Sequence, residues 1–235
     1  MTPTAYRLDN NIIRIFGGLR DDDGVSRIGY LDVDSKNPKH ILGISKQPVL
    51  EIGEHGNFDD NGVILGDVLE VGSKLYMYYV GFQLARKVKF LAFSGLAISD
   101  NGGESFERFK QTPVMDRSEG SSTLRAIHSV IKEDGVFKVW HSVGKGAGWE
   151  WIKEQPYPAY NIWYTESFDG INFEGRSRLC IDTGNTEYRI GRPRVYKNGD
   201  LYQMYYTADH RERNYLAGYA ESMDGINWVR KDECC

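Results

Sequence analysis

The segment Ala217-Gly-Tyr-Ala-Glu-Ser-Met-Asp-Gly-Ile-Asn-Trp228 indicates a repeat protein, because its pattern occurs twice more along the chain. The earlier copies are Ile162-Trp-Tyr-Thr-Glu-Ser-Phe-Asp-Gly-Ile-Asn-Phe173 and Gly95-Leu-Ala-Ile-Ser-Asp-Asn-Gly-Gly-Glu-Ser-Phe106. Each copy predicts a strand, a tight turn and an aromatic residue that opens the next strand. The glycine supplies the positive φ that such a turn needs, and the aspartate can bond to its own backbone.

A predicted hairpin precedes each copy of this pattern. The three hairpins span Val63–Gly81, Leu124–His141 and Ile190–Thr207. Each is a short strand, a glycine-containing turn and an alternating aromatic strand, and two of the turns contain the Asn-Gly or Asp-Gly pairs that hairpins favour. The valines at 68, 130 and 195 occupy equivalent positions in the three hairpins.

The N-terminal part fits the same frame, with strands expected over 4–8, 12–18, 26–33 and 41–50. A four-stranded unit therefore repeats four times, every 55–65 residues or roughly so. We predict one all-β domain over 1–235, with units near 2–52, 57–116, 118–182 and 186–233. A β-propeller is favoured over the alternative, a β-sandwich of hairpins, because the repeat spans whole four-stranded units.

Composition limits the function classes. With 40% hydrophobic residues the chain can form a core, and its net charge of −4 argues against a nucleic-acid binder. No apolar run approaches the roughly 18 residues of a membrane-spanning helix. The first residues contain no apolar signal core, and Cys180, Cys234 and Cys235 form no disulfide or metal pattern. We expect a cytoplasmic protein without metal or cofactor.

Several segments carry a family likeness: Phe58-Asp-Asp-Asn-Gly-Val63, the following Tyr-Met-Tyr-Tyr, Ser26-Arg-Ile-Gly-Tyr30 and the Ala-Glu-Ser-x-Asp-Gly-Ile-Asn-Trp ending. The chain resembles the five-bladed β-propeller glycosidases, which include arabinanases, xylosidases, levansucrases, invertases and mannoside phosphorylases. It looks closest to glycosidase-like propellers of bacteria. The resemblance implies five blades where four are visible, so we expect a fifth blade or an oligomeric partner to cover the open edges.

The candidate catalytic residues are carboxylates. Counting back eight residues from the three valines reaches Asp60, Ser122 and Glu187. Two carboxylates across a sugar are the usual device of glycoside hydrolysis, which predicts Glu187 as an acid of raised pKa and Asp60 as the base or as the group that tunes the acid. In the family that the chain resembles, an aspartate of the second blade tunes the pKa of the acid, and Asp60 is the residue that matches it. Glu119 is a rival for the acid, and the alternative for these carboxylates is loop capping.

The candidate substrate-binding residues are mostly basic. Arginine forks bind carboxylate or phosphate in a bidentate way, so Arg27, Arg125 and Arg192 would suit an acidic sugar or a phosphate. The alternative is that they form structural ion pairs with the candidate carboxylates. His128 is expected either to reach substrate or to be a satisfied histidine of the sheet.

The insertion at 144–160 contains Trp149 and is rich in glycine and aromatic residues, so we expect either a sugar-stacking roof or a packed loop. The sequence thus predicts a glycoside hydrolase or phosphorylase that acts on an oligo- or polysaccharide. The loop that brings the catalytic base in this family would precede the first blade and is not visible here. The alternatives are therefore a non-catalytic carbohydrate-binding propeller and an interaction module in surface-polysaccharide assembly.

Overall fold

The computed structural model describes residues 3–173, 175, 177–212 and 215–234. In these residues the chain forms sixteen strands and one short 3-10 helix, Asp232–Cys234, so the predicted all-β class is confirmed. Two compact units divide the chain: Met1–Leu84 with Phe90–Val114, and Ala85–Lys89 with Met115–Cys235. None of the described residues forms a helix long and apolar enough to cross a membrane.

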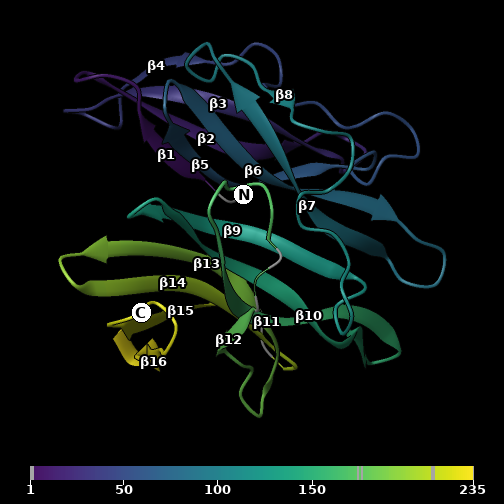
Figure 1. The fold of residues 1–235 in the computed structure, drawn as a ribbon. Coiled ribbons are helices and arrows are strands. Elements are labelled where there is room, and N and C mark those ends of the chain that lie inside the picture. The colour runs from purple at the N-terminus through teal and green to yellow at the C-terminus, as the bar shows by residue number, and fades with distance from the viewer. Residues whose placement is uncertain (1–2, 174, 176, 213–214, 235) are drawn as a thin grey trace. The chain divides into compact units, whose positions relative to one another are not determined.

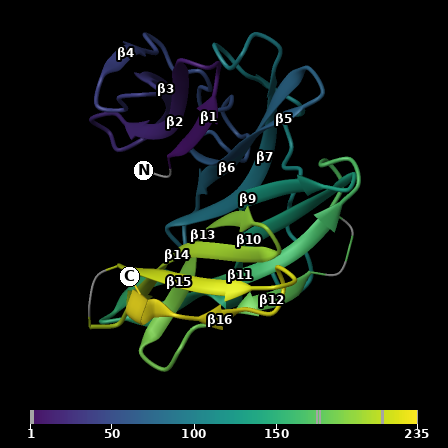
Figure 2. The same cartoon turned by 90° about the vertical axis from the view of Figure 1, so that its left-hand side faces the viewer.

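The first unit contains two antiparallel four-stranded meanders, and Figure 1 draws their strands in purple to blue-green. In Figure 2 the strands of the first meander lie side by side in chain order. This first sheet is made of β1 (Thr4–Arg7), β2 (Ile12–Arg20), β3 (Ser26–Asp34) and β4 (Ile41–Ile44). The next is made of β5 (Val63–Val71), β6 (Lys74–Leu84), β7 (Phe90–Ser99) and β8 (Glu107–Arg108).

The second unit repeats this plan with two more meanders. The third sheet is made of β9 (Leu124–Glu133), β10 (Val136–Ile152), β11 (Gln155–Ser167) and β12 (Arg178–Ile181). The fourth is made of β13 (Glu187–Asn198), β14 (Leu201–His210), β15 (Leu216–Ser222) and β16 (Val229–Arg230). Each predicted four-stranded unit therefore holds one four-stranded meander, and the insertion at 144–160 extends the β10–β11 hairpin instead of forming an irregular loop.

The strand register confirms that the three valines are equivalent. Val68 pairs with Met77, Val130 with Val139, and Val195 with Met204. Each partner lies nine residues further along the chain, because each hairpin closes with a two-residue turn that contains a glycine of positive φ.

The repeated serine–aspartate turns are built alike. In the third sheet the Asp169 carboxylate accepts the backbone N–H groups of Ile171 and Asn172, both at 2.8 Å, and the Ser167 hydroxyl accepts the Gly170 N–H at 2.9 Å. Asp224 and Ser222 make the same bonds at the same distances in the fourth sheet. The turn thus satisfies its own backbone, which explains why its sequence recurs.

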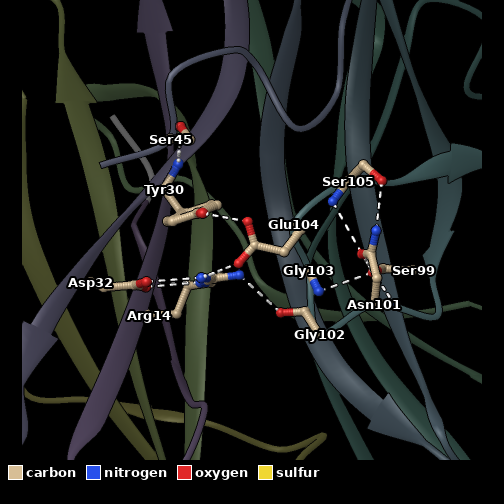
Figure 3. A network of polar contacts seen from close by, with 10 residues as sticks. All are labelled: Arg14, Tyr30, Asp32, Ser45, Ser99, Asn101, Gly102, Gly103, Glu104 and Ser105. Carbon is tan, nitrogen blue, oxygen red and sulfur yellow. Dashed lines mark hydrogen bonds and ion pairs between the residues drawn. The ribbon is translucent and has the colours of Figure 1, made fainter. Parts of the chain in front are cut away.

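In the first unit an apolar core is joined by a buried polar network. The core packs β2, β3, β5, β6 and β7 around side chains such as Phe16, Leu65 and Met77. Arg14 of β2 is 2% exposed and donates to both Asp32 oxygens at 2.8 Å and to Glu104 at 2.7 Å. Glu104 lies in the turn between β7 and β8, so this network ties the first sheet to the second (Figure 3).

In the second unit the charges of the corresponding network are reversed. One carboxylate, Glu133 of β9, binds the ammonium groups of Lys138 and Lys197 and accepts the Tyr202 hydroxyl at 2.7 Å. Hydrogen bonds from Lys138, Lys197 and Tyr202 lower the Glu133 pKa to about 2. An apolar core around Trp140, Ile190 and Met204 packs the third sheet against the fourth.

Candidate functional site

A cavity of about 710 Å³ opens in the second unit, beside the start of β9 and the middle of β10 and β11. Its wall combines charged, amide and aromatic side chains, which is the chemistry of a site for a polar ligand with apolar faces. The described residues that line it are Ser118, Glu119, Gly120, Ser121, Arg125, Val143, Gly144, Lys145, Gly146, Asn161, Trp163, Phe173, Gly175, Ser177, Leu179 and Asp182.

Glu119 stands at this cavity on a tight turn. The N–H groups and carbonyls of Ser118 and Ser121 bond to each other at 3.2 and 3.0 Å, and Gly120 between them has a φ of 77°. Glu119 is exposed, and none of the described residues donates a hydrogen bond to its carboxylate. This carboxyl group is therefore free to meet a ligand.

The cavity also contains a carboxylate that, unlike Glu119, accepts hydrogen bonds from neighbouring side chains. Asp182 accepts the Lys145 ammonium at 2.8 Å and the Asn161 amide at 3.1 Å, and the Asn161 oxygen accepts the Trp163 indole N–H at 2.6 Å. Burial would raise the pKa of Asp182, but Lys145 and Asn161 outweigh it and lower that pKa. The indole is thus fixed in orientation with a ring at the cavity.

Of the predicted basic residues, Arg125 belongs to this cavity. It is half-buried and donates to the Asp116 carbonyl at 2.8 Å. Burial lowers the pKa of Arg125. Arg125 also acts on His141 of the neighbouring strand, whose pKa falls to about 3 because of burial, Arg125 and His128. Both ring nitrogens of His141 are buried without a hydrogen-bond partner.

His128 is the extra residue of a β-bulge in β9, where the register shifts between Ile127 and Ser129. It is 7% exposed, and burial together with the charge of Arg192 lowers its pKa to about 3. The charge of Arg192 therefore acts on His128, whereas the charge of Arg125 acts on His141. Arg192 itself lies on a second bulge, in β13, and is exposed.

Glu187 is placed differently from the expectation. It is 4% exposed, and Arg230 of β16 donates to its two oxygens at 3.0 and 2.6 Å while the Gly184 N–H donates at 2.6 Å. Burial would raise its pKa, but the Arg230 guanidinium and the Gly184 amide outweigh burial and lower it. The expectation of a raised pKa is therefore wrong, because the partly apolar setting includes a bidentate arginine.

Asp60, in the first unit, is half-buried and caps its own loop. It accepts the Gly56 N–H at 2.9 Å and the Asn61 amide at 2.6 Å. The neighbouring Asp59 is the fully buried carboxylate, with bonds from Arg108 of β8 at 2.8 Å and from Tyr79 at 3.0 Å. These loop contacts match the alternative foreseen for Asp60, and its catalytic role stays a prediction.

Two other predicted residues have simpler surroundings. Arg27 is paired with Asp21 at 2.5 Å and Glu51 at 2.7 Å, so it forms structural ion pairs, although with other acids than those expected. Trp149 is half-buried on the extended β10 strand, opposite Pro158. Its role in sugar stacking stays a prediction.

Sequence reasoning missed Lys145, Asn161, Trp163 and Asp182. Asn161 and Trp163 alternate on one strand, a period that places them on the same face, and this signal was available. Asp182 follows the short outer strand, and nothing in the repeat marks it. Among the described residues no group of three His, Cys, Asp or Glu side chains lies close enough to hold a metal ion.

Solved structures with a similar fold are glycoside hydrolases. A thermostable family-43 glycoside hydrolase superposes with a TM-score of 0.70 at 17% identity, over 98% of this chain and 71% of that one. The α-L-arabinofuranosidase of Lactobacillus brevis gives a TM-score of 0.74 at 11% identity, over 98% and 72%. The chain therefore has the β-propeller fold of the family-43 and family-32 glycosidases, and the sandwich alternative is set aside.

No protein-family model matches the sequence. Curated relatives do: the uncharacterized protein Rv1502 of Mycobacterium tuberculosis strain H37Rv is 33% identical over an alignment that covers 98% of this chain and 76% of Rv1502. The uncharacterized protein MT1551 of strain CDC 1551 matches with the same identity and coverage. By this similarity the chain belongs to the protein family of Rv1502.

Proposed function

We propose that the protein binds a glycan in the cavity of its second unit and cleaves a glycosidic bond there, with Glu119 as the proton donor. The observation that supports this proposal is the free Glu119 carboxyl beside an oriented indole in a cavity of about 710 Å³. Aromatic faces stack on sugar rings, and a carboxylic acid can protonate the leaving oxygen.

Glu119 fits the role of the acid better than Glu187. The Arg230 guanidinium stabilises the ionised form of Glu187, whereas an acid must hold a proton that it can give away. Asp60 lies in the first unit and does not line this cavity, so its catalytic role stays a prediction apart from this proposal. Hydrolysis and phosphorolysis use the same proton donor and differ in what attacks the sugar carbon.

The test compares Glu119→Gln with Glu187→Gln on a panel of aryl glycosides, with and without inorganic phosphate. We expect Glu119→Gln to lower kcat by at least 100-fold on substrates with poor leaving groups while the sugar still binds. Glu187→Gln should keep most of its kcat per folded molecule. Full activity of Glu119→Gln would overturn the assignment of the acid.

A second candidate function is sugar binding without turnover. It is favoured by the contacts of Glu187, since one of the three carboxylates predicted for catalysis is neutralised by Arg230 of its own blade. Binding of glycans by the wild type with no turnover of any substrate in the panel would select this function.

A further inference from the structure

Arg192 is strained in a way that no turn explains. Four described residues other than glycine have a positive φ: Asp134, Lys153, Glu154 and Arg192. The first three lie at two-residue hairpin turns, where the left-handed conformation is needed. Arg192, with a φ of 54°, lies inside strand β13. Strain in mid-strand persists only where the surroundings impose it, and such residues cluster at functional sites.

The surroundings of Arg192 impose this conformation through a bulge. The register of β13 shifts between Gly191 and Arg194, and the Arg192 N–H points to the Ser142 hydroxyl at 3.4 Å. A Cβ atom at Gly191 would come within 2.6 Å of both the Ser142 hydroxyl and the Tyr160 ring. Gly191 therefore packs directly on β10 and β11, and the bulge turns the next side chain, Arg192, outward.

The charge of Arg192 is not compensated by its neighbours. Arg189, on the same strand, is neutralised by Asp209 at 2.6 Å. No carboxylate among the described residues forms an ion pair with Arg192, whose guanidinium lies instead 5.2 Å from the centre of the exposed Tyr215 ring. An exposed guanidinium beside an aromatic face is suited to the carboxylate or phosphate oxygens of a charged sugar.

His128 adds a neutral group on strand β9, where the hydroxyl of the next residue, Ser129, accepts the Val195 N–H of β13 at 3.0 Å. Its pKa is lowered by burial and by Arg192, so near neutral pH it can offer one N–H donor without adding charge. The groups around Arg192 are the Ser142 hydroxyl, the rings of Tyr160 and Tyr215, His128, and the Arg189 guanidinium that Asp209 neutralises. No carboxylate of the described residues pairs with Arg192 itself, so its exposed guanidinium is open to an anionic ligand.

We infer that Arg192, Tyr215 and His128 form a subsite for the oxyanion of a charged sugar, either the carboxylate of a uronic acid or a sugar phosphate. The inference rests on the proposed function for the sugar and on the Arg192 site for the charge. On this inference the positive φ of Arg192 costs stability of the folded state but presents the guanidinium to the ligand.

The experiment uses Arg192→Gly and Arg192→Asn, because both residues tolerate a positive φ, and Arg178→Gln as a control on an exposed arginine of β12. Binding of glucuronate, galacturonate and glucose 6-phosphate is measured by calorimetry, with glucose and galactose as neutral counterparts. Wild type and Arg178→Gln should bind a uronate or the phosphate at least tenfold more tightly than the neutral sugar. Both Arg192 variants should lose this preference, with melting temperatures equal to or above that of the wild type.

Two results would overturn the inference: a wild type without preference for a charged sugar, or an Arg192 variant that keeps the preference. A melting temperature that falls in both Arg192 variants would also overturn it, because it would assign the arginine a structural role. Turnover is scored separately with Glu119→Gln. Charged-sugar preference without turnover leaves this inference standing and removes the proposed cleavage, whereas turnover without preference does the reverse.

Discussion

The second and fourth sheets each tie a buried carboxylate to an arginine of their outermost strand. In the second, Arg108 binds Asp59 and lies 5.7 Å from the centre of the Tyr79 ring. In the fourth, Arg230 binds Glu187 and lies 5.7 Å from the centre of the Tyr206 ring. Because the same carboxylate–arginine pair occurs in two blades, it belongs to the repeat. This indicates that Glu187 has a structural role, in which it binds the outermost strand of its blade through Arg230.

The difference between the two ties is in how completely they are satisfied. Oδ1 of Asp59 is buried without a hydrogen-bond partner, and Tyr79 gives its hydroxyl to Oδ2. Both oxygens of Glu187 accept hydrogen bonds, and Tyr206 donates to Asp232, at 2.5 Å, instead. Asp59 therefore has Arg108 as its charged partner and no backbone donor among the described residues, whereas Glu187 accepts the Gly184 N–H besides Arg230, and Arg230 also pairs with Asp232.

The largest effect is expected from Arg108→Met. This change leaves the fully buried Asp59 without a counter-charge, and removing one partner of a buried ion pair costs about 3–5 kcal/mol of unfolding free energy. Arg230→Met should lose less, because Glu187 keeps the Gly184 N–H. Urea denaturation at neutral pH measures both. Arg20→Met, on an exposed arginine of β2, is the control, and equal losses in the two blades would contradict the comparison.

The repeat itself could be predicted from the sequence. The glycine turns and the three valines fix the register of the β5–β6, β9–β10 and β13–β14 hairpins, because two-residue turns leave no freedom in strand pairing. The candidate site could be predicted only in part. The count of eight residues back from Val68 crosses one bulge in β5, whereas the same count from Val195 crosses two bulges in β13. The counts reach Asp60 and Glu187, but the residue whose arginine contact matches that of Glu187 is Asp59. Bulges add residues that a count along the chain does not detect.

Contacts between distant segments account for the rest of what was missed. The engagement of Glu187 depends on Arg230, 43 residues further on, and that of Asp59 on Arg108, 49 residues further on. The strain at Arg192 likewise depends on Ser142 of another sheet. No local pattern encodes these pairs, so a carboxylate at a plausible place could not be distinguished from a carboxylate that an arginine had already neutralised.

An intermediate effect is expected from Glu187→Gln, with a dependence on pH. Because the folded protein lowers the pKa of Glu187 below its ordinary value of 4.5, the stability it contributes is present above pH 4.5 and is lost as pH falls through the lowered pKa. We expect Glu187→Gln to cost about 1–2 kcal/mol at pH 7 and to flatten the acid side of the stability profile. Urea midpoints between pH 3 and pH 7 measure this, with Glu212→Gln as the exposed control. If the stability of the variant depended on pH in the same way as that of the wild type, the Arg230 and Gly184 contacts would not be lowering the pKa of Glu187.

The smallest effect on stability is expected from changing the aspartate of a serine–aspartate turn to asparagine, because one blade already has asparagine at this position. The second sheet has Asn101 where the third has Asp169, and Asn101 accepts the Ser99 hydroxyl at 2.7 Å and the Ser105 N–H at 3.2 Å (Figure 3). Asp169→Asn should therefore keep the turn and lose only the charge assistance of its hydrogen bonds, about 0.5 kcal/mol. Asp169→Ala removes the acceptor and should cost about 1–2 kcal/mol.

The two variants also differ in their response to acid. The N–H groups of Asn172 and Ile171 lower the pKa of Asp169, so the advantage of the wild type over Asp169→Asn should be present above the ordinary pKa and shrink as pH falls through the lowered one. Thermal unfolding at pH 7 and pH 3 measures this, with Asp100→Ala, an exposed neighbour of Asn101, as the control. If Asp169→Asn were as damaging as Asp169→Ala, the asparagine turn of the second sheet could not be the working equivalent of the aspartate turns. The second blade would then have to be stabilised by other contacts, of which the Arg14–Glu104 pair beside Asn101 is the first to test.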